Sequence, residues 1–269
     1  MHRSGKRLGS GVFGVVEELK MAGTSCTGKK FHATQFDAHN KGMIAQYIST
    51  CKLMDKIRHP NIVQFMGLFL FSENVHPMIV TEKIDVNMET FLKTNSDLSL
   101  PFILWILRDV TRGLIYIHSQ KPPIIHHDLT ARNVLVMKAS MSLNAKIADL
   151  GNALMVDPVK LSTTLIQAPE ILPYMPPEAL CYKPNYDSNF DMFSLGHLSL
   201  FAVIQTYPGD LLPPLFSDPL TEELRVRSEV ERRAKYVKIL HTKLAKDHMI
   251  TKMILQCLHN LPEKRYVTL

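Results

Sequence analysis

The predominant spacing of apolar residues shifts near residues 81–87 of this chain. Before that point, short runs of β-branched and aromatic residues are separated by turn signals such as Ala22-Gly23, a pattern typical of strands. After it, apolar residues recur every three or four positions, for example from Ile103 to Ile117, which is typical of amphipathic helices. The sequence therefore predicts an α+β fold, with a small β-rich N-terminal lobe (1–80), a connecting segment (81–87) and a larger α-helical C-terminal lobe (88–269).

The same patterns predict the individual elements. In the first part, we expect strands within 6–19, 26–36, 62–71 and 77–81 and a helix over 43–57. In the second part, we expect helices over 103–117, 192–204 and 250–258. The run from Met192 to Ile204 is apolar almost all round, which predicts a helix buried in the core of the larger lobe.

Composition excludes several classes of protein. With 269 residues, of which 46% are hydrophobic and 21% charged, the chain is long and apolar enough to bury a core, and it is neither disordered nor fibrous. Its longest strongly apolar stretch, 195–204, contains His197 and Ser199 and is too short to span a membrane. No signal peptide is visible and the four cysteines form no CxxC pair, so we expect reduced thiols and a cytoplasmic location.

Much of the net charge of +6 comes from residues 225–238, where six basic side chains accompany two acidic ones. This stretch is either a docking patch for an acidic partner or the solvated face of a helix. The aromatic residues give no support for nucleic-acid binding, so we expect no nucleic-acid partner.

A glycine-rich segment, GSGVFGVV at 9–16, follows Leu8 and is flanked by valines, which predicts a strand–turn–strand. Glycines let the backbone approach phosphate groups closely and offer N–H donors to them. A dinucleotide-binding fingerprint would run into a helix instead. The segment is therefore a candidate phosphate-binding loop.

Three further segments follow at fixed separations. IIHHDLTARNVLV (124–136) holds Asp128 and Asn133 ahead of an apolar strand, and KIADLG (146–151) is an expected strand ending in Asp149. PYMPPEAL lies at 173–180. Two acids and an amide at the ends of strands can bind Mg²⁺ and orient a hydroxyl nucleophile.

In this order and at these separations, the segments resemble a eukaryotic protein kinase domain over essentially the whole chain, and look closest to the tyrosine-kinase-like and tyrosine-kinase branches. The resemblance extends to RHPNIV (58–63), the hinge-like IVTE (79–82), DMFSLG (191–196) and CLHNLPEKR (257–265). The family implies a two-lobed fold joined by a hinge, ATP in the cleft, Mg²⁺, and phosphoryl transfer to a hydroxyl group of a protein substrate.

The resemblance implies a role for each matching residue. Asp128 is the expected catalytic base that accepts the proton of the substrate hydroxyl, and Asn133 and Asp149 are the expected Mg²⁺ ligands. We expect His126 to be a core residue and Glu178 to pair with Arg265. Nucleotide contacts are expected from Leu8, Gly9, Ser10, Gly11, Gly14, Val16, Thr81 (the gatekeeper), Glu82, Ile84 and Leu135.

The phosphate-gripping lysine of the family's V-A-x-K motif has two possible positions. The segment HATQ keeps the alanine but ends in Gln35, whereas CTGK ends in Lys29. One strand, a turn and most of a second strand need about twenty residues. Lys29 follows Gly9 by 20 residues and Gln35 follows it by 26. We therefore choose Lys29, and strand alternation places Thr27 on the same face.

Two departures from the family pattern leave the activity open. Thr50 stands where a helix glutamate is expected to pair with the strand lysine, and His127 replaces an arginine that receives a phosphate. The chain is therefore either an active kinase or a pseudokinase that binds nucleotide or acts as a scaffold. Arg132 resembles tyrosine kinases, but PYMPPE lacks their common tryptophan, so both Ser/Thr and Tyr substrates remain open.

Overall fold

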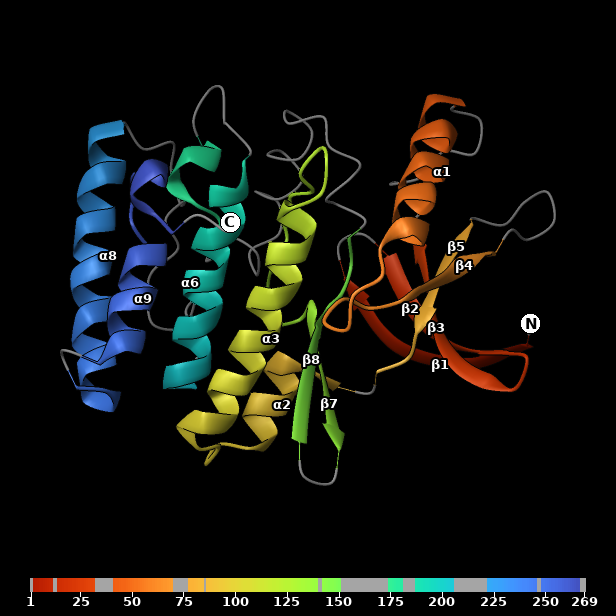
Figure 1. The fold of residues 1–269 in the computed structure, drawn as a ribbon, viewed down its shortest axis with the longest axis horizontal. Helices are drawn as coiled ribbons and strands as arrows, with labels where there is room; N and C mark the ends of the chain where they lie inside the picture. The colour runs from red at the N-terminus through yellow and green to blue at the C-terminus, as the bar shows by residue number, and fades with distance from the viewer. Residues whose placement is uncertain are drawn as a thin grey trace. The chain divides into compact units, whose positions relative to one another are not determined.

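The structure is a computed structural model that describes residues 2–11, 14–31, 41–69, 77–84, 86–139, 142–150, 174–180, 187–205, 222–245 and 248–266. The chain divides into two compact units, Met1–Asp85 (unit 1) and Val86–Leu269 (unit 2). Unit 1 consists mainly of strands and unit 2 mainly of helices (Figure 1), which confirms the α+β fold class.

Unit 1 is built on a five-stranded sheet in which every paired neighbour is antiparallel, in the order β1-β2-β3-β5-β4. Helix α1 lies beside β4 (Figure 1), and it is the one helix among the described residues of unit 1. The chain enters β2 from the glycine-rich hairpin and turns into β3 at Ala22 and Gly23, both of which have positive φ angles. The elements are β1 (His2–Gly11), β2 (Gly14–Met21), β3 (Thr24–Phe31), α1 (Lys41–Lys56), β4 (Phe65–Phe69) and β5 (Met78–Glu82).

One face of this sheet carries an apolar cluster of Leu19, Cys26, Met78 and Val80, each at most 1% exposed. Gly28 lies on the same face, because a Cβ at this position would come within 2.2 Å of the Met78 sulfur. Successive side chains of a strand point to opposite faces. The residues of β3 that alternate with this cluster therefore belong to the other face of the sheet.

Unit 2 places a small sheet against a group of helices. Its strands are β6 (Val86–Asn87), β7 (Val134–Ala139) and β8 (Ser142–Ile147), paired antiparallel in that order. Helix α3 packs along β8 (Figure 1), and the buried Asp109 of α3 accepts the backbone N–H of Ala145 at 3.1 Å. The helical elements are α2 (Met88–Thr94), α3 (Leu100–His118), α6 (Ser188–Ile204), α8 (Glu222–Lys243) and α9 (Met249–Cys257), with short 3₁₀ helices η2 (Pro177–Leu180) and η3 (Pro262–Lys264).

Helix α6 is the centre of unit 2, and α3, α8 and α9 pack around it (Figure 1). All residues from Phe190 to Ile204 are buried. Asp187 caps its N-terminus by accepting the backbone N–H of Asn189 at 2.8 Å. Gly196 lies where α9 approaches, because a Cβ there would come within 2.8–2.9 Å of Leu258 and Cys257. The prediction of a helix buried on all sides is confirmed.

The observed elements differ from the predicted ones in the residues at which they begin and end. Helix α6 begins four residues earlier than predicted, at Ser188, because Asp187 supplies the cap. Strand β4 begins at Phe65 instead of Ile62, and β8 ends at Ile147, two residues before Asp149. Residues 32–36 and 70–71, predicted as parts of strands, lie outside the described residues.

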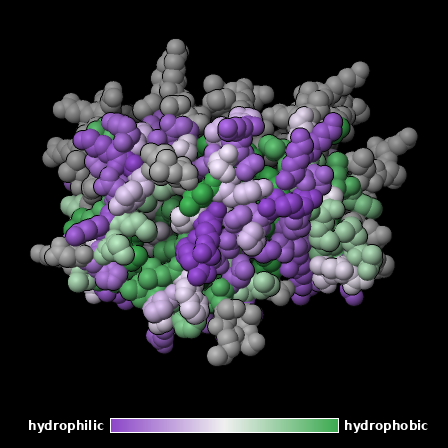
Figure 2. Space-filling model, viewed as in Figure 1, coloured by the Kyte–Doolittle hydropathy of each residue, from purple (hydrophilic) through white to green (hydrophobic). Residues whose placement is uncertain are grey.

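The described surface mixes hydrophilic and hydrophobic residues (Figure 2), and the exposed large apolar side chains include Phe102 and Trp105 of α3. Three cysteines, Cys26, Cys51 and Cys257, are free thiols and all three are buried, whereas Cys181 lies outside the described residues. Burial raises the pKa of the Cys51 thiol to about 11 and that of Cys257 to about 12. Among the described helices, none has the length and apolar character that a membrane crossing requires.

Candidate active site

The loop that carries Asp128 lies between α3 and β7, and hydrogen bonds of the buried His126 side chain stabilise it. The His126 side chain is fully buried, which confirms it as a core residue. Its Nδ1 accepts the backbone N–H of Asp128 at 3.2 Å. A ring nitrogen that accepts carries no proton, so Nε2 holds the proton and donates to the carbonyl of Ala148 at 2.9 Å. His126 therefore joins the Asp128 loop to the segment that leads into Asp149.

Asp191 anchors this loop from the centre of unit 2. Its carboxylate, which is fully buried on α6, accepts the backbone N–H groups of His126 at 2.7 Å and His127 at 3.0 Å. It also bonds His118 Nε2 of α3 at 2.7 Å. Burial alone would raise the pKa of Asp191, but the hydrogen bond from His118 and the surrounding imidazoles outweigh burial and lower it. One carboxylate thus holds α3, α6 and the Asp128 loop in a common arrangement.

Asn133 closes the loop at its other end. Its side-chain Nδ2 donates to the carbonyl of Asp128 at 2.8 Å, and its own carbonyl accepts the N–H of Ala148 at 2.7 Å. Because the amide nitrogen is engaged in this way, Oδ1 is the atom that can act as a metal ligand. Asp128 itself is buried, with 5% of its surface exposed.

Asp149 follows β8 in a left-handed conformation, with φ of 64°. Aspartate tolerates this region better than most residues, although a non-glycine residue there still carries some strain. Asp149, which is half-buried, and Asn133 both offer hard oxygen donors, a carboxylate and an amide oxygen. Mg²⁺ needs only one or two carboxylates in addition to phosphate oxygens and water, so these two residues fit the predicted metal.

In unit 1, the predicted phosphate-binding segment is a hairpin between β1 and β2. Gly9 pairs with Val16, Ser10 with Val15 and Gly11 with Gly14. No atom lies within 4 Å of the position that a Cβ would take on Gly9. Gly9 thus has open space beside its backbone, and Leu8 precedes it with 38% of its surface exposed.

Lys29 lies near the end of β3, between Val16 of β2 and Ile79 of β5. Its register places it on the face opposite the apolar cluster, together with Thr27. The alternative candidate, Gln35, lies outside the described residues. The assignment of the phosphate-gripping role to Lys29 stays a prediction.

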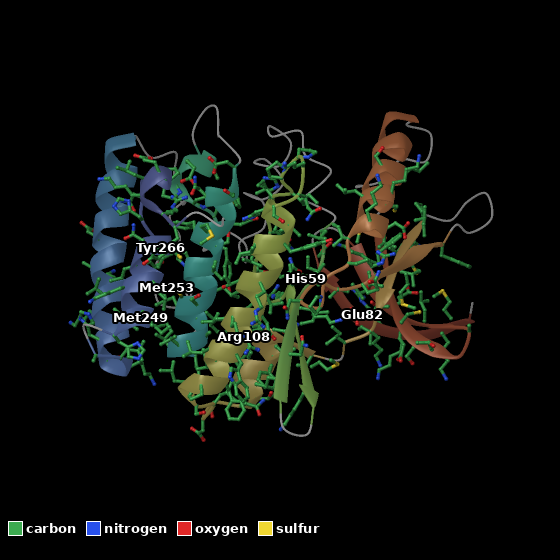
Figure 3. All side chains as sticks on the ribbon, viewed as in Figure 1. His59, Glu82, Arg108, Met249, Met253 and Tyr266 are labelled. Carbon is green, nitrogen blue, oxygen red and sulfur yellow. The ribbon has the colours of Figure 1, made fainter. Side chains whose placement is uncertain are left out.

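The segment predicted to contact the nucleobase ends β5 and continues to Ile84. Thr81 pairs with Thr27 across β3 and β5, and Figure 3 labels Glu82 at the end of β5. The N–H of Glu82 donates to the carbonyl of Gln64 at 3.0 Å, so this N–H is already engaged within unit 1. Half-buried Ile84 follows the strand. Leu135, the remaining predicted nucleotide contact, is half-buried on β7 of unit 2.

Arg132 and Glu178 are both ion-paired in unit 2. Arg132 Nε bonds Glu89 of α2 at 2.8 Å, with about half of the Arg132 side chain exposed. Burial of Glu89 would raise its pKa, but hydrogen bonds from Lys93 and Arg132 outweigh this and lower it. The predicted Glu178–Arg265 pair is confirmed, with Arg265 Nη2 to Glu178 Oε2 at 2.9 Å and an Arg265 side chain that is fully buried.

Several predicted features can be placed only in part. His127 has a φ of 63°, is 6% exposed, and packs its ring edge-on against Phe190 with 5.3 Å between centroids. Thr50 lies within α1, but its side chain lies outside the described residues, as does Gly151. The basic stretch 225–238 lies on α8, where Lys235 and Lys238 are exposed.

A family model described as the protein kinase domain matches residues 2–268. The chain belongs to the protein kinase family.

Individual relatives carry serine/threonine and dual-specificity names. The dual specificity protein kinase splA of Dictyostelium discoideum is 27% identical over 78% of this chain and 9% of its own length. The serine/threonine-protein kinase VIK of Arabidopsis thaliana is 28% identical over 75% of this chain and 45% of its own length. The human dual specificity testis-specific protein kinase 2 is 31% identical over 63% of this chain and 29% of its own length. The chain therefore spans less than half the length of these relatives.

Sequence reasoning missed the role of Asp191. The residue lies in the segment DMFSLG, which contributed to the resemblance, but no function followed from its position there. A signal was present, because an aspartate inside an otherwise apolar helix is buried only when it is paired. What the sequence alone does not show is that its partners come from α3 and from the Asp128 loop.

Proposed function

We propose that this kinase domain is an active enzyme that transfers the γ-phosphate of ATP to a serine, threonine or tyrosine hydroxyl of a protein, in cytoplasmic signalling. The hydrogen bond from Asn133 to the carbonyl of Asp128 carries this proposal. It couples a candidate metal ligand to the candidate base at 2.8 Å, inside a loop that Asp191 and His126 already hold. A module that only binds a partner has no physical need for this arrangement.

Each residue has a distinct role in the proposed reaction. Asp128 accepts the proton of the substrate hydroxyl as that oxygen attacks the phosphorus. Asn133 Oδ1 and the Asp149 carboxylate would hold Mg²⁺, which would neutralise charge on the phosphates when bound. Lys29 and the N–H groups of the glycine hairpin bind the phosphates, while Thr81, Glu82 and Ile84 face the base.

A pseudokinase is the second candidate, and Thr50 and His127 favour it. A lysine without a glutamate partner is less well positioned on the phosphates. The His127 ring packs against Phe190 and is 6% exposed, so it is poorly placed to receive a phosphate group. The domain would then bind nucleotide or serve as a scaffold, and 225–238 on α8 would be a proposed docking site for an acidic partner.

The substrate class follows neither from Arg132 alone nor from the relatives alone. Arg132 favours tyrosine, whereas the serine/threonine and dual-specificity names of the relatives favour a broader choice. We therefore propose that the domain accepts both kinds of hydroxyl. Phosphoamino-acid analysis of a labelled protein substrate distinguishes the possibilities.

The decisive experiment measures ATP-dependent phosphate incorporation by the purified domain with Mg²⁺. Asp128→Asn should reduce the rate by about 10²- to 10⁴-fold, the range expected when a positioned general base is removed. Asp97→Asn is the matched control, because Asp97 is an exposed aspartate in the turn between α2 and α3, and it should leave the rate unchanged.

Equal rates for the wild-type and Asp128→Asn proteins would contradict the assignment of the base. No turnover by a folded wild-type protein that binds ATP would favour the pseudokinase. A Mg²⁺-independent thermal shift with ATP would contradict Asp149 and Asn133 as metal ligands.

A further inference from the structure

A pair of hydroxyl groups lies at the point where β3 meets the end of β5. Thr27 Oγ and Thr81 Oγ are 2.7 Å apart. Thr27 Oγ also donates to the carbonyl of Glu82 at 3.4 Å. Both threonines are half-buried and belong to the sheet face opposite the apolar cluster. The family motif V-A-x-K carries alanine at the position of Thr27, and alanine cannot form these bonds.

When both hydrogen bonds form, only one assignment of donors and acceptors is possible. A hydroxyl group has one proton and two lone pairs. When Thr27 gives its proton to the Glu82 carbonyl, the bond between the two threonines requires Thr81 to be the donor. The relay is therefore Thr81 O–H to Thr27 Oγ, and Thr27 O–H to Glu82 C=O. The Thr81 proton is then engaged in the bond to Thr27, and the Thr81 hydroxyl can act only as an acceptor toward any other group.

Two charged residues beside this relay, Glu18 and Lys83, are paired with each other. Glu18 lies opposite Thr27 in the β2–β3 register, and Glu18 Oε1 binds Lys83 Nζ at 3.0 Å. The hydrogen bond from Lys83 lowers the pKa of Glu18, which keeps the carboxylate ionised and the pair formed. The Glu82 carboxylate accepts the backbone N–H of Gln64 at 2.7 Å. The groups of the relay itself at the end of β5, the Thr81 hydroxyl and the Glu82 carbonyl, are neutral.

We propose that Thr27 is a positioning residue that sets the choice of nucleobase by keeping Thr81 in its accepting orientation. A base edge that faces two acceptors must donate, as the 6-amino group of adenine does. A 6-oxo group, as in hypoxanthine, would place a third acceptor against them and leave buried polar atoms unpaired. This inference rests on the proposed function, because it takes Thr81 and Glu82 as the residues that face the base.

The test compares the affinities of Mg²⁺–ADP and Mg²⁺–IDP, which differ only at the 6-position and its neighbouring N1 proton. Isothermal titration calorimetry measures binding without turnover. The wild-type protein should prefer ADP. Thr27→Val keeps the shape and removes the hydroxyl, so Thr81 is released to donate, and the ADP-to-IDP preference should fall about three- to tenfold, the range for one neutral hydrogen bond. Thr27→Ser restores the hydroxyl and should keep the preference within about twofold of wild type.

A double-mutant comparison separates this relay from a general loss of packing. In a Thr81→Val background, Thr27→Val should change the ADP-to-IDP preference no further, because the residue through which it acts is gone. Equal preferences in the wild-type and Thr27→Val proteins, or a Thr27→Ser protein that behaves like Thr27→Val, would overturn the inference while leaving the proposed function standing. Failure of the folded wild-type protein to bind either nucleotide would overturn both.

Discussion

The two units hold their candidate site residues in different ways. In unit 2, Asp128 and Asn133 lie in a loop whose backbone is bonded to buried side chains, chiefly His126 and Asp191. In unit 1, Lys29 and Thr81 lie on neighbouring strands and owe their positions to the register of β3 and β5. Buried polar groups are costly when they lose a partner, whereas a strand register is shared among many backbone hydrogen bonds. Single substitutions should therefore disturb the unit 2 site more than the unit 1 site.

Asp191→Asn should produce the largest loss of stability. The amide would present N–H groups to donors that now meet a carboxylate, and each buried donor left unpaired costs about 1–3 kcal/mol. Urea unfolding at pH 7 measures the loss. Asp97→Asn, at an exposed position, should change the free energy of unfolding by less than about 0.5 kcal/mol.

The same network should also show in the pH dependence of stability. The pKa of Asp191 in the folded chain lies below its ordinary value of 3.8. Its stabilising contribution is therefore complete above that value and is lost as the pH falls through the lower folded pKa. An Asp191→Asn protein should lack this part of the acid response. A full acid response in a folded Asp191→Asn protein would show that the anchor lies elsewhere.

Lys29→Met sharpens the comparison on the side of unit 1. Because the strand register, not the side chain, builds the sheet, the variant should fold normally but transfer phosphate about 10²-fold more slowly, as expected when one electrostatic contact to the phosphates is lost. Lys30→Met is the control on the opposite face of the same strand. Initial rates at saturating ATP decide the matter. A larger effect at Lys30 than at Lys29 would reverse the face assignment of β3.

Two glycines give the smallest and most direct comparison. A Cβ on Gly196 of α6 would meet Leu258 Cγ at 2.8 Å and Cys257 Cβ at 2.9 Å, atoms close to the backbone of α9 that cannot move alone. A Cβ on Gly28 of β3 would meet Met78 Sδ at 2.2 Å, Leu19 Cδ1 at 2.6 Å and Met78 Cγ at 2.8 Å, and the first two of these atoms lie toward the flexible ends of their side chains. Gly196→Ala should therefore cost about 1–3 kcal/mol of stability and Gly28→Ala less, as measured by chemical unfolding. The opposite order would show that the core of unit 1 is the more tightly packed of the two.

Much of the fold could be predicted from local patterns in the sequence. Alternation and helical spacing depend on residues within one element, so the strands of unit 1 and the helices α1, α3, α6 and α9 were predicted close to their observed bounds. The glycine hairpin and the loop from Asp128 to Asn133 are likewise short and contiguous. The kinase family was visible from these segments alone, and the match over residues 2–268 confirms it.

Tertiary structure decided the interactions between residues far apart in the chain. Asp191 meets donors 65 and 73 positions away, and Thr27 meets Thr81 across 54 positions. Such contacts depend on how strands align and helices pack, and a slip of one residue in β3 would exchange its two faces. No local pattern encodes that alignment, because it is set by the summed packing of Leu19, Met78 and their neighbours in the core. The identities of the candidate catalytic residues were therefore readable in the sequence, whereas the groups that hold and orient them emerged only from the folded chain.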